Sequence, residues 1–423
     1  MGIVSKLRAK LGDFWWYTLM IFCACRASDA LNALVGLYLV PKYVSAEELG
    51  AVLPLSNFAT TLTFPIGVLA TVFMKEVNVL AVRGEYGRMK SLMRGVFLFG
   101  AIFLVAAIII SHLALPLFLE RIRIARGSLG FLILAAAFCS AVSPIYLNAL
   151  QALNKFKTIS LINLLGGPLR FLAMIAAMPF RALSGYFVGQ MASPSFTIVA
   201  SVWSLRRELS VKAERYWSSD TTRRLLKFAA LVGLYMAIGA VPSFVEPLVL
   251  RSRLPDGDSA AYYILTRFSE ISLMLSATIQ MILFPYVSER TERGESARAQ
   301  VVKAIAASLV FAFVFALPFL FVGEELISFL PNGCAYASYA KYIPWLVGIA
   351  ALTSVQAVYT TARVAEKSFG FLWWWTAVNL GYSAALWYAP NLNTLSAVLG
   401  YFTISAVLKA AFSIAGLLGR RGK

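Results

Sequence analysis

Apolar residues run through this chain in long blocks, and short polar segments rich in Lys, Arg, Gly and Pro separate the blocks. A helix needs about 20 predominantly apolar residues to cross the hydrocarbon core of a bilayer. Each block is long enough and therefore predicts one transmembrane helix. About twelve helices are predicted, near residues 14–40, 48–74, 92–111, 129–150, 158–178, 184–205, 228–250, 259–286, 304–322, 340–362, 369–388 and 394–417.

Composition supports the same class of protein. Of the 423 residues, 60% are hydrophobic and only 14% are charged, and the mean hydropathy is +0.75. A soluble domain carries about 25% charged residues. These values exclude an ordinary soluble enzyme and predict an all-α polytopic membrane protein.

The formal net charge of +18 arises largely from Lys and Arg in the segments between predicted helices. Basic residues concentrate in the cytoplasmic connections of membrane proteins. Alternate connections carry most of them here, which predicts that both termini are cytoplasmic and gives no indication of a nucleic-acid partner. The basic residues on this side include Lys6, Arg8, Lys10, Arg83, Arg88, Lys90, Arg94, Arg206, Arg207, Lys212, Arg215, Arg223, Arg224 and Lys227.

The sequence repeats itself weakly at an offset near 210 residues. Arg83-Gly84-Glu85 follows the second predicted helix, and Arg293-Gly294-Glu295 follows the eighth. Six helices, an even number, separate the two halves, so both halves have the same orientation. Parallel repeats of this kind build transporters whose site lies between two helix bundles. We therefore expect two six-helix lobes around a central cavity, residues 1–205 and 228–423, joined by a basic cytoplasmic linker at 206–227.

Charged residues inside the predicted helices form the candidate site. A charge at bilayer depth is costly, so it usually faces a bundle interior or a wet cavity and marks a transport path. Arg26 and Asp29 are three residues apart, as are Arg267 and Glu270, and this spacing places each pair on one helical face. The candidate substrate-binding residues are Arg26, Asp29, Arg170, Arg267, Glu270 and Lys409, and the candidates for coupling to an ion are Asp29 and Glu246.

Arg170 is the best single candidate for contact with an anion. It follows a Gly166-Gly167-Pro168 break and has no acidic neighbour on its own predicted helix. The other candidates have structural alternatives. The two Arg–carboxylate pairs could only hold the bundle together, and Lys409 could reach the cytoplasmic interface, as long basic side chains often do. Glu246 precedes Pro247 and could instead mark a kink near the outer boundary.

Several short motifs follow one another in a fixed order along nearly the whole chain. They are Leu39-Val40-Pro41-Lys42-Tyr43-Val44, Ala46-Glu47-Glu48-Leu49-Gly50, Arg83-Gly84-Glu85, Leu150-Gln151-Ala152-Leu153-Asn154-Lys155-Phe156 and Leu226-Lys227-Phe228. In this order the chain resembles the polysaccharide (O-antigen-type) flippases of the multidrug/oligosaccharidyl-lipid/polysaccharide exporter superfamily. The resemblance implies two six-helix lobes around a cavity, and translocation of undecaprenyl-pyrophosphate-linked sugars across the bacterial inner membrane.

The intramembrane arginines agree with that substrate class. A guanidinium group presents a planar fork of donors that matches phosphate oxygens and keeps its charge when partly buried. The expected partners are a polyprenyl-linked glycan lipid, membrane lipids, and glycosyltransferases or a polymerase of the same pathway. No cofactor is expected.

Two other functions stay open. A multidrug or cation exporter of the same superfamily would favour an acidic cavity, which Asp29 or Glu246 could supply. A membrane glycan polymerase or ligase would be expected to carry a large outer loop, whereas the longest predicted outer connections lie only near 112–128 and 323–339. The sequence contains no Walker loop or nucleophile elbow, and its four cysteines lack metal-binding spacing. We therefore expect a transporter rather than an enzyme, with no metal site.

Overall fold

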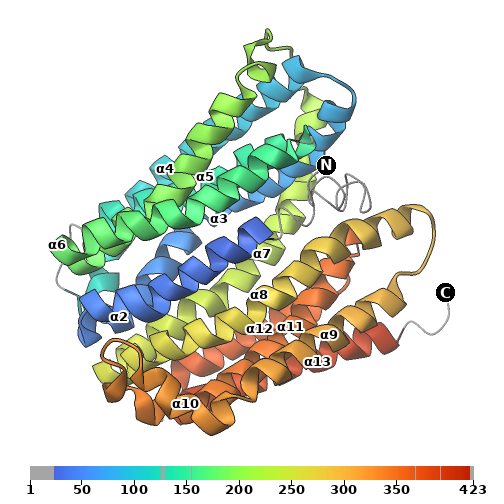
Figure 1. Ribbon diagram of the computed structural model, residues 1–423. Coiled ribbons are helices and arrows are strands. Elements are labelled where there is room, and N and C mark those ends of the chain that lie inside the picture. The colour runs from blue at the N-terminus through green and yellow to red at the C-terminus, as the bar shows by residue number, and fades with distance from the viewer. Residues whose placement is uncertain (1–22, 125–128, 154, 367, 391, 420–423) are drawn as a thin grey trace, which may run out of the picture. The chain divides into compact units, whose positions relative to one another are not determined.

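The computed structural model describes residues 23–124, 129–153, 155–366, 368–390 and 392–419, and these residues are helical almost throughout (Figure 1). Within these ranges no β-strand occurs, so the all-α prediction is confirmed. The first helix runs over Cys23–Tyr43 and contains a π-helical turn at Val35–Leu39 followed by α2 at Val40–Tyr43. The other α-helices are α3 (Ala46–Val82), α4 (Tyr86–Arg121), α5 (Leu129–Ala152), α6 (Phe156–Leu205), α7 (Ser219–Arg253), α8 (Asp256–Glu292), α9 (Arg298–Ala316), α10 (Phe319–Ser328), α11 (Ile343–Ala365), α12 (Leu372–Tyr388) and α13 (Leu395–Leu418).

The predicted membrane-spanning helices each correspond to an observed helix. In the described part of the chain, nine helices are long and apolar enough to cross a membrane by length and composition. One of these nine helices, α6, contains two of the predicted helices. Helices α8 and α12, which are not among the nine, correspond to the two remaining predicted helices. The ninth helix lies earlier in the chain than the predicted 304–322: α9 runs over Arg298–Ala316, and α10 begins after Pro318, a residue that interrupts helical hydrogen bonding. Residues 14–22 of the first predicted helix lie outside the described residues.

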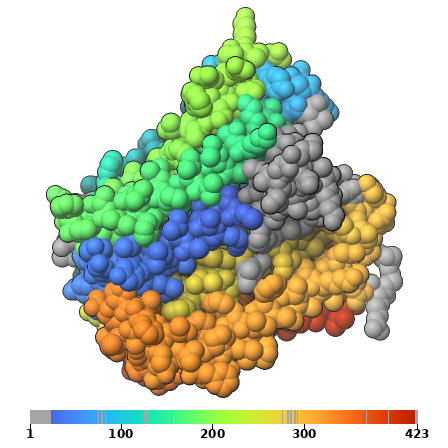
Figure 2. Space-filling view, viewed as in Figure 1, coloured from blue at the N-terminus to red at the C-terminus, as the bar shows by residue number. Residues whose placement is uncertain are grey.

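Helix α6 is a pair of antiparallel helices joined by a tight turn. Arg181 (φ −147°, ψ 43°) and Ala182 (φ 16°, ψ −103°) leave the helical conformation and reverse the chain. A Cβ atom at Gly185 would lie 2.5 Å from the carbonyl oxygen of Ala177, and one at Gly189 would collide with Met174, so the two halves of α6 approach closely only because both positions are glycine. The hairpin forms a continuous part of the surface (green in Figure 2), where many of its apolar side chains are exposed, as expected for contact with lipid.

Contacts divide the chain into two units. Unit 1 contains residues 23–35 and 55–237 of the described chain, and unit 2 contains residues 36–54 and 238–419. The core of unit 1 is built from α3, α4, α5 and α6 around residues such as Phe73, Leu92 and Ile145. The core of unit 2 includes Val287 of α8 and Val358 of α11. Helix α7 contributes to both units. The lobes predicted at 1–205 and 228–423, with their linker at 206–227, describe repeat symmetry and stay a prediction.

The connections after α3 and α8 are built alike at the predicted offset. After α3, Gly84 has φ +70° and Glu85 N donates to Leu80 O at 2.9 Å; after α8, Gly294 has φ +72° and Glu295 N donates to Arg290 O at 2.8 Å. Both are Schellman caps, in which a glycine at positive φ ends the helix. The Arg-Gly-Glu repeat of the sequence therefore encodes the same helix ending twice.

Candidate functional site

A polar seam joins the first helix to the first half of α6 within unit 1. Cys25, Ser28, Asp29 and Asn32 recur at helical spacing and lie on one face of the first helix. The Ser28 hydroxyl donates to the carbonyl oxygen of Asn163 in α6. The side-chain amide of Asn163 lies 3.5 Å from Cys25 Sγ, a weak acceptor. The seam thus satisfies polar groups that would otherwise be costly at bilayer depth.

The Gly-Gly-Pro break allows this close contact. A Cβ atom at Gly167 would lie 2.8 Å from Ser28 Cα, and one at Gly166 would lie 2.7 Å from Ser193 Oγ in the second half of α6. Only glycine fits at Gly167 without displacing the first helix, because the neighbouring atom belongs to the Ser28 backbone. The break noted in the sequence is therefore a packing feature that brings Arg170, one turn later, beside the first helix.

Two of the predicted arginines belong to the seam. Arg26 pairs with Asp29 at 3.1 Å, and both side chains are about one quarter exposed (28% each). Arg170 Nη1 donates to Asn32 Oδ1 at 2.9 Å. Asn32 is a neutral acceptor, so this bond positions the guanidinium group by a hydrogen bond. The seam therefore brings together the guanidinium groups of Arg26 and Arg170.

The other predicted pair lies on α8 in unit 2. Arg267 Nη1 and Glu270 Oε2 are 2.7 Å apart, and the guanidinium group of Arg267 lies 4.8 Å from the centroid of the Tyr263 ring. A Cβ atom at Gly36 would lie 2.8 Å from Arg267 Cδ, so the aliphatic stem of Arg267 packs against the first helix. The side chain of Glu270 is 43% exposed, and that of Arg267 only 20%.

Unit 2 also encloses a polar cavity of about 290 Å³. Five helices contribute to its wall, and Glu246 of α7 and Lys409 of α13 both line it. The Lys409 ammonium group lies 5.8 Å from the Trp375 ring centroid and 5.7 Å from that of Tyr382, and it interacts electrostatically with Glu246. Further lining residues are Tyr262, Thr266, Ser269, Thr353, Gln356, Asn379 and Ser405.

The structure therefore brings the predicted residues together in three places. Arg26, Asp29 and Arg170 share the seam of unit 1; Glu246 and Lys409 share the cavity of unit 2; Arg267 and Glu270 pair on α8. Lys409 faces the cavity, and this placement disfavours the alternative that it reaches the interface. The central cavity expected from the sequence stays a prediction. No group of metal-binding residues occurs in the part of the chain that the structure describes.

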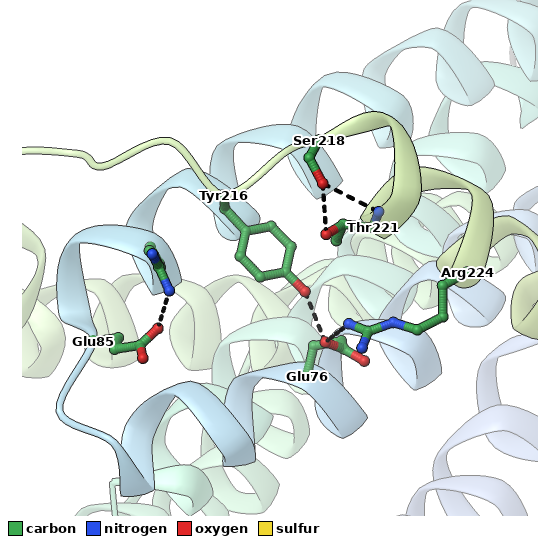
Figure 3. Close-up of polar contacts among 7 residues, drawn as sticks. Glu76, Glu85, Tyr216, Ser218, Thr221 and Arg224 are labelled. Carbon is green, nitrogen blue, oxygen red and sulfur yellow. Dashed lines mark hydrogen bonds and ion pairs between the residues drawn. The ribbon is translucent and has the colours of Figure 1, made fainter.

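Sequence reasoning missed a second polar network, outside the membrane-spanning segments (Figure 3). The hydroxyl group of Tyr216 donates to Glu76 Oε2 at 2.7 Å, and Arg224 Nη2 lies 2.9 Å from the same oxygen. Burial raises the pKa of Tyr216, and the hydrogen bond to Glu76 raises it further. Glu76 and Tyr216 are 140 residues apart, and no local pattern in the sequence links them.

This network anchors residues 208–218, which we call the strap, to unit 1. Trp217 Nε1 donates to Ser91 O at 3.2 Å, and Lys90 Nζ donates to Val211 O at 2.8 Å. At the start of the strap, Lys155 Nζ and Glu208 Oε1 are 2.8 Å apart. Burial alone would raise the pKa of Glu208, but the hydrogen bond and the charge of Lys155 lower it.

No protein-family model and no curated protein matches the sequence. Solved structures do match the fold. A structure of the lipid II flippase MurJ in an inward closed conformation matches with a TM-score of 0.67 and 15% identity, covering 95% of this chain and 87% of that one. A point mutant of the Vibrio cholerae MATE transporter VcmN matches with a TM-score of 0.65 and 14% identity over 95% of both chains.

The fold is that of the multidrug/oligosaccharidyl-lipid/polysaccharide transporters. Flippases and drug transporters of this superfamily both occur among the matching structures, so the protein is a polytopic membrane protein with a transporter fold. A third match, a superfamily transporter from Pyrococcus furiosus (TM-score 0.60, 14% identity, 99% of this chain and 98% of that one), is described as having a binding pocket of reverse polarity that suggests a different function. At these identities the multidrug/oligosaccharidyl-lipid/polysaccharide fold alone is shared, and the substrate has to be argued from the charges of the site.

Proposed function

We propose that the protein is a flippase that moves a polyprenyl-pyrophosphate-linked oligosaccharide across the bacterial inner membrane by alternating access, for synthesis of a cell-surface polysaccharide. The observation that carries the proposal is the seam of unit 1, which gathers two guanidinium groups, those of Arg26 and Arg170, on one polar helix contact. A forked guanidinium group binds phosphate oxygens in a bidentate manner, and the hydrogen bond to the neutral amide of Asn32 orients Arg170.

The lipid-linked sugar also needs a polar route, because its pyrophosphate and glycan cannot cross hydrocarbon. Arg170, Arg267 and Lys409 are the proposed cationic contacts along this route, with Asp29, Glu246 and Glu270 as their counter-charges. Both termini are proposed to be cytoplasmic. Enzymes that assemble or polymerise the glycan are the proposed partners.

An exporter of organic cations is the second candidate. Its supporting observation is Glu246 in the cavity of unit 2, where a carboxylate could receive a cation. The ammonium group of Lys409 lies in the same cavity and opposes this use, since it supplies the positive charge internally. Efflux of a fluorescent cationic dye from intact cells separates the two functions.

The test is export of the lipid-linked glycan by variants of Arg170. Arg170→Ala should abolish export while the protein remains inserted at normal levels, because the anion contact is lost. Arg170→Lys should restore export only in part, because an ammonium group keeps the charge but lacks the planar fork. The matched control is Arg181→Ala, at the turn of the same α6 hairpin, which should export normally. Normal export by Arg170→Ala would refute the assignment, and loss of the protein from the membrane would indicate a structural role.

A further inference from the structure

The polar cavity of unit 2 has a wall rich in hydrogen-bond acceptors. Three hydroxyl groups in this wall each donate their hydrogen to a backbone carbonyl of their own helix: those of Thr266 and Ser269 on α8 and of Thr353 on α11, at 2.7, 2.9 and 2.9 Å. A hydroxyl group has a single hydrogen, so each of these oxygens can only accept from any further group. Glu246 of α7 adds a carboxylate, which also only accepts when it is ionised. An occupant of the cavity should therefore be rich in donors.

Two aromatic rings of α12 add to this preference. The Lys409 ammonium group lies 5.8 Å from the centroid of the Trp375 ring and 5.7 Å from that of Tyr382, within the range of about 6 Å over which a ring face attracts a cation. Trp375 itself lines the cavity. A carboxylate, oxygens that only accept and ring faces all favour positive charge, so the wall has the chemistry of a cation site.

The chain itself supplies a cation to this wall. Lys409 belongs to α13, and among the residues that line the cavity it and Glu246 are the charged ones. Its ammonium group carries three donors and no acceptor, and it interacts electrostatically with Glu246. Because the ammonium group is covalently attached, it loses no translational freedom in the cavity, whereas a dissolved ion does. A second cation would also be repelled by the first, with one carboxylate to neutralise both.

We propose that the polar cavity of unit 2 is a binding site for a monovalent cation and that the Lys409 ammonium group is its occupant. The unmodified protein then needs no dissolved sodium, potassium or organic ammonium ion in this cavity. Removal of the Lys409 side chain opens the site to such an ion. The inference goes beyond the proposed flippase function, because it holds for whichever substrate is moved.

Replacement of the tethered ammonium group by a free one tests the proposal. Lys409→Ala removes three carbons and the nitrogen, which together are the heavy atoms of the n-propylammonium ion. Propylammonium chloride, titrated into the purified variant in detergent, should raise the midpoint of thermal unfolding by about 2 °C or more, because a ligand that binds only the folded state stabilises it. The unmodified protein and Lys409→Arg keep a tethered cation and should not respond. Equal concentrations of n-propanol should not stabilise Lys409→Ala, because propanol lacks the charge.

Two further variants serve as controls. Lys341→Ala removes an exposed lysine that also lies over an aromatic ring but does not line the cavity, and it should not respond to propylammonium. Glu246→Gln combined with Lys409→Ala should fold and lose the response, because the carboxylate that holds the cation is gone. If Lys409→Ala alone does not fold, purification with propylammonium should recover it, and failure to recover it would refute the proposal.

Three results would overturn the proposal. Absence of a response in folded Lys409→Ala would show that the cavity does not hold a cation. An equal response in Lys341→Ala or in the unmodified protein would show a general effect of the amine. A higher unfolding midpoint of the unmodified protein in sodium or potassium chloride than in choline chloride would show that a dissolved cation enters the site. Lack of glycan export would refute the flippase and leave these measurements unaffected, so the two proposals fail separately.

Discussion

Individual charged side chains inside this membrane protein are held by partners on other helices. Arg170 donates to Asn32 of the first helix, and Lys409 lies over two aromatic rings of α12 and opposite Glu246 of α7. Such partners remove most of the cost of a charge at bilayer depth. Each partner also connects two helices, so removing one charge should affect stability as well as transport.

The Glu246–Lys409 pair allows a test of that coupling. Lys409→Met should lower the free energy of unfolding by about 3–5 kcal/mol, because removing one partner of a buried pair leaves the other charge uncompensated. The double variant Glu246→Gln with Lys409→Met should be more stable than Lys409→Met alone. Thermal unfolding in detergent measures the difference. Lys341→Met removes an exposed lysine that also lies over a ring and should change little. Strict additivity of the two substitutions would contradict a direct interaction.

Local spacing predicted some of these contacts and could not predict others. The three-residue spacing correctly indicated that Arg26 can pair with Asp29 and Arg267 with Glu270, because a helix places such residues on one face. The position of Lys409 in a cavity depends on where α7, α8, α11 and α12 pack around α13. Tertiary packing of this kind leaves no periodic signal in the sequence.

At the scale of elements, two connections between helices show how far the path of the chain could be predicted from the sequence. The predicted break between 158–178 and 184–205 is a real chain reversal, at which Arg181 and Ala182 leave the helical conformation. The segment between α6 and α7 is the opposite case. Its basic composition predicted a cytoplasmic linker and gave no contacts for it, whereas the strap within it is hydrogen-bonded to α3 and α4 through Tyr216, Trp217 and Val211. The aromatic residues Tyr216 and Trp217, in an otherwise basic segment, were the signal in the sequence that could have indicated these contacts.

The strap should resist proteolysis. Trypsin can cleave after Lys212 and Arg215 only when the strap leaves unit 1, so the cleavage rate reports the open population. Tyr216→Phe removes the hydrogen bond to the Glu76 carboxylate and should raise the rate about tenfold, since a hydrogen bond to a charged group contributes about 1.5 kcal/mol or more. Tyr388→Phe alters an exposed tyrosine and serves as the control. Equal rates for all three proteins would show that the bond does not hold the strap.

At the scale of the whole molecule, the fold was largely predictable because a membrane imposes length and polarity on every spanning segment. The sequence indicated the number of helices, their all-α class and the positions of most connections. The division into packed units was harder to predict from the sequence, because it depends on contacts between distant residues, such as that between Gly50 and Ser259.

Topology is the direct test at this scale. Reporter fusions after Arg215 and after Pro255 flank α7 and should report opposite sides of the membrane, the first one cytoplasmic. The expectation follows from the concentration of basic residues in alternate connections. A fusion after Arg293 should report the same side as the one after Arg215, because one further helix, α8, lies between Pro255 and Arg293. Signals from the same side at Arg215 and Pro255 would contradict the twelve-helix arrangement.

The membership of residues 36–54 in unit 2 has a consequence for recombination between related genes. This segment precedes nearly all of unit 1 in the sequence, yet its contacts are with later residues: Pro41 O accepts from Asn332 Nδ2 at 2.8 Å, and Gly36 packs against Arg267. A crossover in the central linker would separate residues 36–54 from these partners. Each would then pack against the corresponding residues of the other parent protein. Halves of two related genes can therefore be exchanged freely only when both genes encode matching residues in the segment 36–54 and at its distant contacts. This requirement favours inheritance of the chain as a whole.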